Sequence, residues 1–538
     1  MDTMIYDPLE EYKSKFRDLH IENARKRLSA LVKQSGVDIE ANRATIKEHE
    51  TRSDELKKLQ KRCTLWRVLR VLACITLLLI PLVIFKITPK IRKFREQIEL
   101  LNNELADLLD LATSQMQPLN ALFTNDDALR LIEETIPMLD FAPFFSAQQE
   151  SDMIENYDFE YDSNIDNTTI ASLAGHYNEN PFVFQKIMTH TLGVETYHGY
   201  KTIFWTESYT DSDGKRKTRT RSQTLHASVT KPKPYYTTHV TLSYCAQGGP
   251  ELCFFRDAEH HEQKSEREVE RYIRKGEKRL KRLTDEAIEE NRDFTSMSNT
   301  DFEVLFDALD RTDEVQFRTL FTPLAQTNLV DIMLSDDAYG DDFNFHKRKR
   351  TNVITTQHSQ QRPVRLAAAY YRSHSYDEIE ERFIGGNAEF FKSIYFDFAP
   401  LWAIPIYQDR PVHSLDPISD YERRFSGCEY ETLANKIAPE LVNHPSTQTE
   451  AILKARFVQR DGGREVIDVS AYSYDMISRV DLIPVYGNDG RWHDVAVAWQ
   501  EYIPLVATNR FFVALADGVK DREPLAQNGE LCIFDSRI

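Results

Sequence analysis

The chain has 538 residues and a formal net charge of −18, from 85 acidic and 67 basic side chains. This length allows about two to four domains with cores of their own, and the acidic balance argues against a general nucleic-acid binder, which would carry a basic face. Six cysteines occur without CxxC pairs or zinc-ligand spacing, so the sequence indicates a reducing compartment, no metal centre and no cofactor.

Residues 1–63 are predicted to be an N-terminal helical, coiled-coil region. Its apolar side chains recur at the 3-4-3 spacing of a helix seam, at Leu9, Tyr12, Phe16 and Leu19. Ser35-Gly36 predicts a break in this region. The half that follows is thinly apolar and highly charged, so we expect it to need a packing partner.

Residues 64–88 form a hydrophobic segment, in which Val71–Phe85 are fifteen consecutive uncharged residues. We predict that this run associates with a membrane. A straight helix needs roughly 20 apolar residues to cross a bilayer core, so the run crosses only if flanking residues extend it. The residues expected to contact lipid tails are Val71, Leu72, Ile75, Leu77, Leu78, Leu79, Ile80, Pro81, Leu82, Val83, Ile84 and Phe85.

Basic residues flank this run on both sides and are expected to bind anionic lipid headgroups. The flanking residues assigned to headgroups are Arg67, Arg70, Lys86, Lys90, Arg92 and Lys93. Because the two flanks carry similar positive charge, the positive-inside rule gives no orientation. A single crossing, a re-entrant hairpin and a buried helix therefore all remain open.

Residues 89–149 are predicted to be a heptad helix followed by a helical connector. The heptad seam consists of Ile91, Phe94, Ile98, Leu101, Leu105 and Leu108. It could pair with the N-terminal helix as an antiparallel hairpin, or with copies of itself in a homo-oligomer. A single membrane crossing would place the two helices on opposite sides and would exclude the hairpin within one chain.

A change in composition marks the boundary to a soluble body, since residues 150–166 contain seven acidic residues and no basic one. We predict an acidic linker there and an antiparallel β-rich subdomain over 167–256. Its clearest element is a hairpin of 200–210 with 217–230, followed by a strand at 238–244 after the connector Lys231-Pro232-Lys233-Pro234. Five basic residues at the hairpin tip could meet phosphate or an acidic partner: Lys215, Arg216, Lys217, Arg219 and Arg221.

The rest of the chain divides into a helical subdomain, 257–345, and an α+β C-terminal subdomain, 346–538. The fold class predicted for the whole chain is thus α+β. Long N-terminal helices surround one hydrophobic membrane segment, and a body of antiparallel or mixed sheets with helices follows.

One acidic segment could carry chemistry, because Asp336, Asp337, Asp341 and Asp342 lie within seven residues. Its Tyr339-Gly340-Asp341-Asp342 resembles, over four residues, the metal-binding turn of RNA-dependent RNA polymerases, where paired aspartates hold Mg²⁺. The preferred interpretation is a solvated acidic loop that the basic run 346–350 neutralises without a metal.

No HExxH, GxSxG, GxxxxGK[ST] or GxGxxG motif occurs in the sequence. The sequence therefore favours a membrane-associated, non-enzymatic protein whose body faces the cytoplasm and binds an unknown protein partner or ligand. The alternative is a membrane-disrupting effector of toxin or defence type, in which a helical hairpin drives an apolar tip into a bilayer. An enzyme on a membrane anchor is third.

Overall fold

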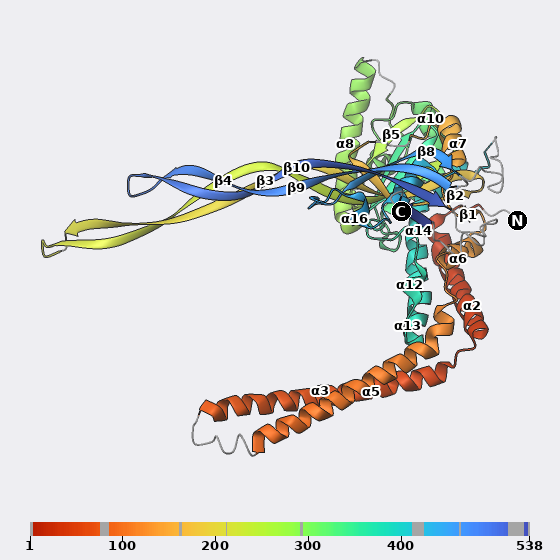
Figure 1. The fold of residues 1–538 in the computed structure, drawn as a ribbon. Coiled ribbons are helices and arrows are strands. Elements are labelled where there is room, and N and C mark those ends of the chain that lie inside the picture. Colours follow the sequence, from red (N-terminus) through yellow and green to blue (C-terminus); the bar gives the residue numbers. More distant parts are fainter. Residues whose placement is uncertain are drawn as a thin grey trace. The chain divides into compact units, whose positions relative to one another are not determined.

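The structure is a computed structural model that describes residues 4–75, 86–160, 164–210, 212–290, 294–411, 424–461, 464–514 and 532–535. The chain forms two compact units. The helical unit comprises Asp7–Pro137 and Arg365–Phe396, and the sheet unit comprises Met1–Tyr6, Met138–Val364 and Asp397–Ile538. The predicted α+β class, with N-terminal helices and a sheet-rich body, is confirmed (Figure 1).

The helical unit begins with a chemically marked helix start. Asp7 accepts a hydrogen bond from the backbone N–H of Glu10 at 3.0 Å, and Pro8 occupies the first helical position. The elements of this unit are α1 (Pro8–Glu11), η1 (Tyr12–Phe16), α2 (Arg17–Ser35), α3 (Ile39–Ile75), α5 (Thr88–Asn120), α6 (Asp127–Thr135), α12 (Ala368–Tyr371), α13 (Tyr376–Glu381), η6 (Arg382–Gly386) and the first part of α14 (Asn387–Trp402).

Aromatic packing holds the base of the helical unit together. The ring centroid of Tyr12 lies 5.0 Å from that of Tyr395 and 4.8 Å from that of Phe396. His20 stacks on Phe391 at 4.1 Å, and burial lowers the pKa of this histidine to about 4. The apolar spacing read from the first helical residues therefore marks the face that packs against α14.

The strands of the sheet unit form two sheets in the described part of the chain. They are β1 (Leu139–Phe141), β2 (Asn167–Tyr177), β3 (Asn180–Thr210), β4 (Arg216–Cys245), β5 (Cys253–Arg256), β6 (Phe343–Arg348), β7 (Thr351–Thr356), β8 (Ile452–Asp461), β9 (Arg464–Tyr486), β10 (Trp492–Ala514) and β11 (Cys532–Asp535). A seven-stranded sheet has the order β1-β2-β3-β4-β7-β6-β5, and a four-stranded sheet has the order β11-β10-β9-β8. Neighbouring strands are antiparallel in both.

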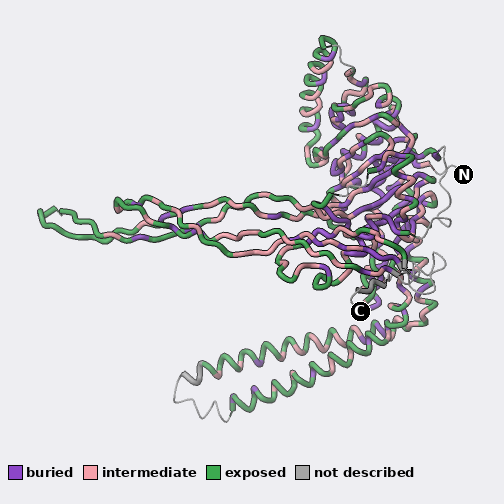
Figure 2. Tube along the Cα trace, turned by 45° about the horizontal axis from the view of Figure 1, so that its top comes forward, coloured by how far each residue is buried: buried purple, intermediate pink, exposed green. Residues whose placement is uncertain are grey.

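Helices cover and connect these sheets. They are α7 (Ala147–Tyr157), η4 (His261–Gln263), α8 (Glu266–Glu290), α9 (Thr300–Phe306), α10 (Glu314–Leu320), α11 (Pro323–Met333), η5 (Asp336–Ala338), η7 (Pro405–Gln408), α15 (Gly427–Ala434) and α16 (Pro439–Val442), with the last turns of α14. Phe398 of α14 packs edge to face on Phe182 and Phe184 of β3. Figure 2 shows burial concentrated in this part of the sheet unit, whereas α3 and α5 are exposed over much of their surface.

The predicted connector Lys231-Pro232-Lys233-Pro234 is not a connector, because β4 runs through it without a break. Pro232 and Pro234 stand opposite Val194 and Leu192 of β3. The two prolines are two positions apart on β4, so their ring nitrogens point to the same edge of that strand. β4 pairs with its other neighbour, β7, only from Thr241 onward, so that edge needs no donor at the prolines.

The predicted acidic linker 150–166 is also partly helical. Its first residues belong to α7, which the Ser146 side chain caps by accepting from the backbone N–H of Gln149 at 3.1 Å. Met153 and Tyr157 of this helix are buried. The high acid content concealed an apolar face, and that face anchors the segment to the sheet unit.

Candidate functional site

The hairpin of α3 and α5 is where the membrane and coiled-coil predictions fall in the structure. The hairpin begins after the break that the sequence predicts at Ser35-Gly36. Gly36 ends α2 with φ 66°, and its N–H donates to the Val32 carbonyl at 3.1 Å. The Asp38 side chain then accepts from the backbone N–H of Ala41 at 3.0 Å and so caps α3. A glycine cap and an aspartate cap therefore separate α2 from α3.

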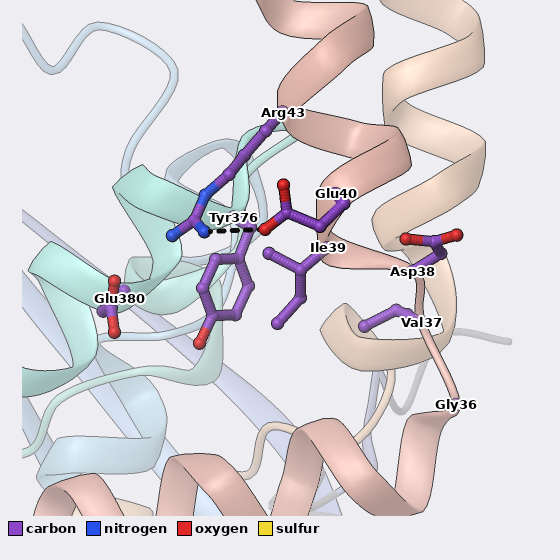
Figure 3. A pocket seen from close by; sticks show the side chains of 8 residues that line it. All are labelled: Gly36, Val37, Asp38, Ile39, Glu40, Arg43, Tyr376 and Glu380. Carbon is purple, nitrogen blue, oxygen red and sulfur yellow. Dashed lines mark hydrogen bonds and ion pairs between the residues drawn. The ribbon is translucent and has the colours of Figure 1, made fainter.

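A wide-open surface pocket of about 610 Å³ lies at this connection (Figure 3). It is lined by Gly36, Val37, Asp38, Ile39, Glu40, Arg43, Tyr376 and Glu380. Arg43 donates to Glu40 at 3.2 Å and to Asp377 at 2.8 Å. Because its central cation is already bound to two carboxylates, we interpret this pocket as a junction of α3 with α13 and assign it no ligand.

Helices α3 and α5 lie side by side and run antiparallel (Figure 1). Three contacts give their register from the base of the hairpin outward: Asn42 Nδ2 to Gln115 Oε1 at 3.3 Å, Arg52 Nε to Glu104 Oε2 at 3.8 Å, and Lys90 Nζ to the Trp66 ring centroid at 4.2 Å. In these three contacts the residue number on α5 decreases as the residue number on α3 increases. The pairing thus extends over most of both helices.

The predicted seam of α5 faces α3. Its buried members are Ile91 and Leu101, and its half-buried members are Phe94, Ile98, Leu105 and Leu108. Near the end of the hairpin, Ile91 packs with Cys63 and Ile87 in one apolar cluster. Of the two alternatives for this seam, the structure has the pairing within one chain, and α5 is the partner that α3 needs. Homo-oligomerisation stays a prediction.

Apolar side chains become exposed on α3 as it approaches the hydrophobic run. They are Leu65, Val68, Leu69 and Val71. Val71–Ile75 form the end of α3, but the side chains of Leu72 and Ile75 lie outside the described residues. So do the remaining residues predicted to contact lipid tails: Leu77, Leu78, Leu79, Ile80, Pro81, Leu82, Val83, Ile84 and Phe85. Among the helices within the described ranges, none combines the length and the apolar content that a membrane crossing requires.

The predicted headgroup residues gather at the same end of the hairpin. Arg67, Lys86, Lys90, Arg92 and Lys93 are exposed and Arg70 is half-buried. Because the helices are antiparallel, the basic residues before the run and those after it meet at one end. We call these six residues the basic collar. The two positively charged flanks of the run thus lie at the same end of the hairpin.

The acidic segment divides into two pairs. Asp336 and Asp337 of η5 are exposed, whereas Asp341 and Asp342 are buried. Gly340, with φ 68°, turns the chain inward at a place where an added Cβ would lie 2.2 Å from a glutamate side chain. The prediction of a solvated acidic loop is therefore wrong for the second pair.

The carboxylate of Asp341 forms an ion pair with the guanidinium of Arg256, and both side chains are 0 % exposed. Nε2 of His261 lies 3.4 Å from Asp341 Oδ2, and burial lowers the pKa of this histidine. The same oxygen accepts from the backbone N–H of Glu259 at 3.1 Å. The partners of this carboxylate thus come from residues 256–261, and not from the basic run 346–350.

Asp342 belongs to a second buried network. Its Oδ2 lies 2.6 Å from Nδ1 of His358, whose Nε2 lies 3.4 Å from Oδ1 of Asp397 in α14. Asp397 also pairs with Arg362, and the ring of Tyr339 stacks on His358 at 4.0 Å. These contacts bind the carboxylates to cations and donors of the chain itself. In the portions of the chain that the structure describes, no cluster of three or more His, Cys, Asp or Glu side chains is arranged to hold a metal ion.

Sequence reasoning found the aspartates but missed Arg256, His358, Arg362 and Asp397. The reason is distance along the chain: Asp341 and Arg256 are 85 positions apart, and Asp342 and His358 are 16 apart. No local pattern connects them. The density of aspartates around a glycine was the only signal, and it fits a solvated turn equally well.

Comparison of the chain with protein-family models, with curated proteins and with solved structures finds no match.

Proposed function

We propose that this chain is a membrane-associated, non-enzymatic protein. Its α3–α5 hairpin brings the apolar run 71–85 to one side of a lipid bilayer, and its sheet unit binds a protein partner or ligand. The basic collar contacts anionic headgroups. We assign no cofactor and no nucleic acid.

The antiparallel pairing of α3 and α5 supports this proposal most strongly. If the run crossed the bilayer once, the two helices would lie on opposite sides and could not pair within one chain. A re-entrant insertion keeps both helices on one side. Fifteen uncharged residues also fall short of the roughly 20 that a straight crossing needs. We therefore favour a re-entrant tip over a single crossing.

The basic collar supports the same geometry. A cation near an anionic leaflet contributes about 1 kcal/mol to binding, so several at one end of a hairpin add a useful electrostatic term to apolar insertion. Four cysteines of the described residues, Cys63, Cys245, Cys253 and Cys428, are free thiols, as a reducing compartment would keep them. This agrees with a sheet unit that faces the cytoplasm.

The experiment that tests the proposal is carbonate extraction of membranes, followed by protease protection of tags at both termini. We expect a carbonate-resistant protein with both tags on the same side. Tags on opposite sides would refute the re-entrant tip, and complete release by carbonate would refute insertion.

A substitution set assigns the effect to the run. Changing Leu77, Leu78 and Leu79 to Asp should release the protein, because each charge placed in a bilayer costs about 2.5–3.5 kcal/mol. The matched control changes Leu100, Leu109 and Leu111 of α5 to Asp, since these leucines are exposed. The control should remain with the membrane. Release of both variants, or of neither, would contradict the proposal.

A membrane-disrupting effector is the second candidate, since it would use the same hairpin and apolar tip. Release of a trapped dye from vesicles separates the two. An anchored binding protein leaves the vesicles intact, whereas an effector empties them at protein concentrations at which it binds.

A further inference from the structure

Two long β-hairpins of the sheet unit extend beyond their sheets. β3 pairs with β2 only as far as Thr189, and β4 pairs with β7 only from Thr241. Beyond those points, β3 and β4 form a two-stranded ribbon that reaches Thr210 and Arg216. β9 and β10 do the same beyond β8 and β11, up to the Tyr486 and Trp492 pair. Figure 1 shows both ribbons leaving the sheets together; we call them the β-arm.

A thin apolar layer holds the two ribbons face to face. It contains Ile203 and Leu225 from the first ribbon and Val495 and Val497 from the second, all buried. The backbones approach so closely that a Cβ on Gly199 would lie 2.2 Å from the Ala496 carbonyl oxygen. In this layer the odd-numbered residues of β10 point inward, so its even-numbered residues point away from the first ribbon.

The outward face of the second ribbon is an exposed apolar stripe. Its large side chains are Val480, Leu482, Tyr486 and Trp492, which are 60, 63, 57 and 69 % exposed. The register places Leu482 opposite Ala496, Val480 opposite Ala498, and Tyr486 opposite Trp492. Between them Pro484 stands opposite Asp494, an exposed residue and the one charged side chain among these four pairs. Single exposed apolar residues are ordinary, but a contiguous patch across two strands marks an interaction surface.

The first ribbon is longer than the second, as Figures 1 and 2 both show. The second ribbon ends beside Gln223, whose side-chain oxygen accepts from the backbone N–H of Asn488 at 2.7 Å. Residues 204–210 and 212–222 therefore project past it as an overhang. Its basic residues are the five predicted at the hairpin tip, and its exposed aromatic residues include Phe204 and Tyr209.

The stripe and part of the overhang face the same side of the β-arm. Ile203 points toward the second ribbon, and alternation along β3 sends Trp205 to the same side. Arg221 and Arg219 of β4 stand opposite Trp205 and Glu207 of β3, so both arginines lie on this side as well. Glu207 forms ion pairs with both arginines at 2.9 Å, so these three side chains together carry one net positive charge. Lys217, opposite Tyr209, adds a second charge, so just beyond the second ribbon this side is aromatic with a modest net positive charge. Over the second ribbon, the same side carries the apolar stripe.

We propose that this side of the β-arm docks on an anionic lipid surface. Such a surface offers both complements together, since negative headgroups match the basic overhang and the interfacial layer accepts tryptophan, tyrosine and aliphatic side chains. The edges of a two-stranded ribbon carry unpaired backbone groups that hydrocarbon cannot satisfy. The β-arm therefore lies in the headgroup layer and does not cross it. This docking goes beyond the proposed function and does not depend on insertion of the α3–α5 hairpin.

The test measures binding of the full-length chain to vesicles of phosphatidylcholine, with and without 30 mol % phosphatidylserine (roughly the anionic fraction that gives a negative leaflet). The starting protein carries Leu77→Asp, Leu78→Asp and Leu79→Asp, and all six residues of the basic collar are changed to Gln, so that neither tip insertion nor the collar contributes. We expect it to bind the anionic vesicles and not the neutral ones. Failure to bind anionic vesicles would overturn the proposal without bearing on carbonate resistance, which tests the hairpin.

Two variants of that protein locate the surface. Changing Lys217, Arg219 and Arg221 to Gln removes three charges from the docking side of the overhang and should weaken binding about tenfold or more. Changing Leu482 and Trp492 to Ser should weaken it by a similar factor, because both side chains would leave the interfacial layer. The matched control changes Arg271, Lys278 and Lys281 to Gln, exposed residues of α8. It alters the net charge equally and should bind within about twofold of its parent.

Unchanged binding by the overhang and stripe variants would overturn the proposal, and so would an equal loss in the α8 control. Analytical ultracentrifugation without lipid addresses other occupants of the stripe. If the starting protein self-associates and the stripe variant does not, while both bind vesicles equally, the stripe is an interface between copies of this chain.

Discussion

Replacing Asp341 by Asn should destabilise the sheet unit by about 3–5 kcal/mol, because removal of one partner from a buried ion pair leaves the other charge uncompensated. The substitution keeps the size of the side chain, removes its charge and replaces one of its two acceptor oxygens by an NH2 donor, although both oxygens accept hydrogen bonds, from Arg256 and from the backbone N–H of Glu259. Arg256 keeps its bond to the Phe343 carbonyl at 2.5 Å and its position 4.2 Å from the centre of the Phe343 ring. Neither contact supplies a full negative charge, so we expect most of the penalty to appear.

The measurement is denaturant unfolding of the full-length protein, followed by circular dichroism and by tryptophan fluorescence. Asp336→Asn is the matched control, since this carboxylate is exposed in η5, and its effect should stay within about 0.5 kcal/mol. The double variant Arg256→Met with Asp341→Asn tests the mechanism. It should lose less stability than the two single variants added together, by about 0.5–3 kcal/mol.

An Asp341→Asn protein as stable as the wild type would refute the assignment of a buried ion pair. Strict additivity in the double variant would refute the coupling of Asp341 with Arg256, even if the single variant were unstable. Loss of Mg²⁺ or Ca²⁺ binding in a variant of normal stability would return a metal site to consideration at this segment.

Three further predictions concern the hairpin, the β-arm and pH. Leu101→Lys should lower the melting temperature of the helical signal, at a cost of about 2–3 kcal/mol, because this side chain is buried between α3 and α5. Leu100 is exposed, so Leu100→Lys should leave the melting temperature unchanged. Equal melting temperatures of the two variants would count against the pairing of α3 with α5. Gly199→Ala should separate the ribbons of the β-arm at a cost of about 1–3 kcal/mol and speed its cleavage by protease, since the added Cβ meets the Ala496 carbonyl; wild-type cleavage rates would contradict the close approach. Burial lowers the pKa of His20 to about 4, below the 6.5 of the unfolded chain. Above pH 6.5 the histidine is neutral in both states and does not alter stability. As pH drops from 6.5 toward 4 the unfolded chain binds the proton more readily, so stability falls by up to about 3 kcal/mol. Burial lowers the pKa of His176 to about 4 as well, so His20→Gln should reduce the slope of that part of the pH profile without abolishing it. An unaltered slope would exclude His20 as one of its sources.

Local patterns predicted the helices of the hairpin but not their partner. The steps of three and four residues from Ile91 to Leu108 identified the buried face of α5, because helical geometry places such residues on one side. They could not decide between α3 and a second copy of α5, since either partner fills the same face. The contact between Trp66 and Lys90 joins two different helices, and no spacing within α5 encodes it.

The sequence by itself determined where the helices break, where the Asp213-Gly214 turn folds β3 back onto β4, and where apolar and basic residues adjoin one another. Those features follow from backbone preferences and side-chain periodicity over a few residues. Only the tertiary structure decided that β4 continues through Pro232 and Pro234, because the unpaired edge that tolerates them depends on where β7 stops. It also decided that Asp341 is buried, since a carboxylate can leave water only when a partner such as Arg256 arrives from elsewhere in the chain.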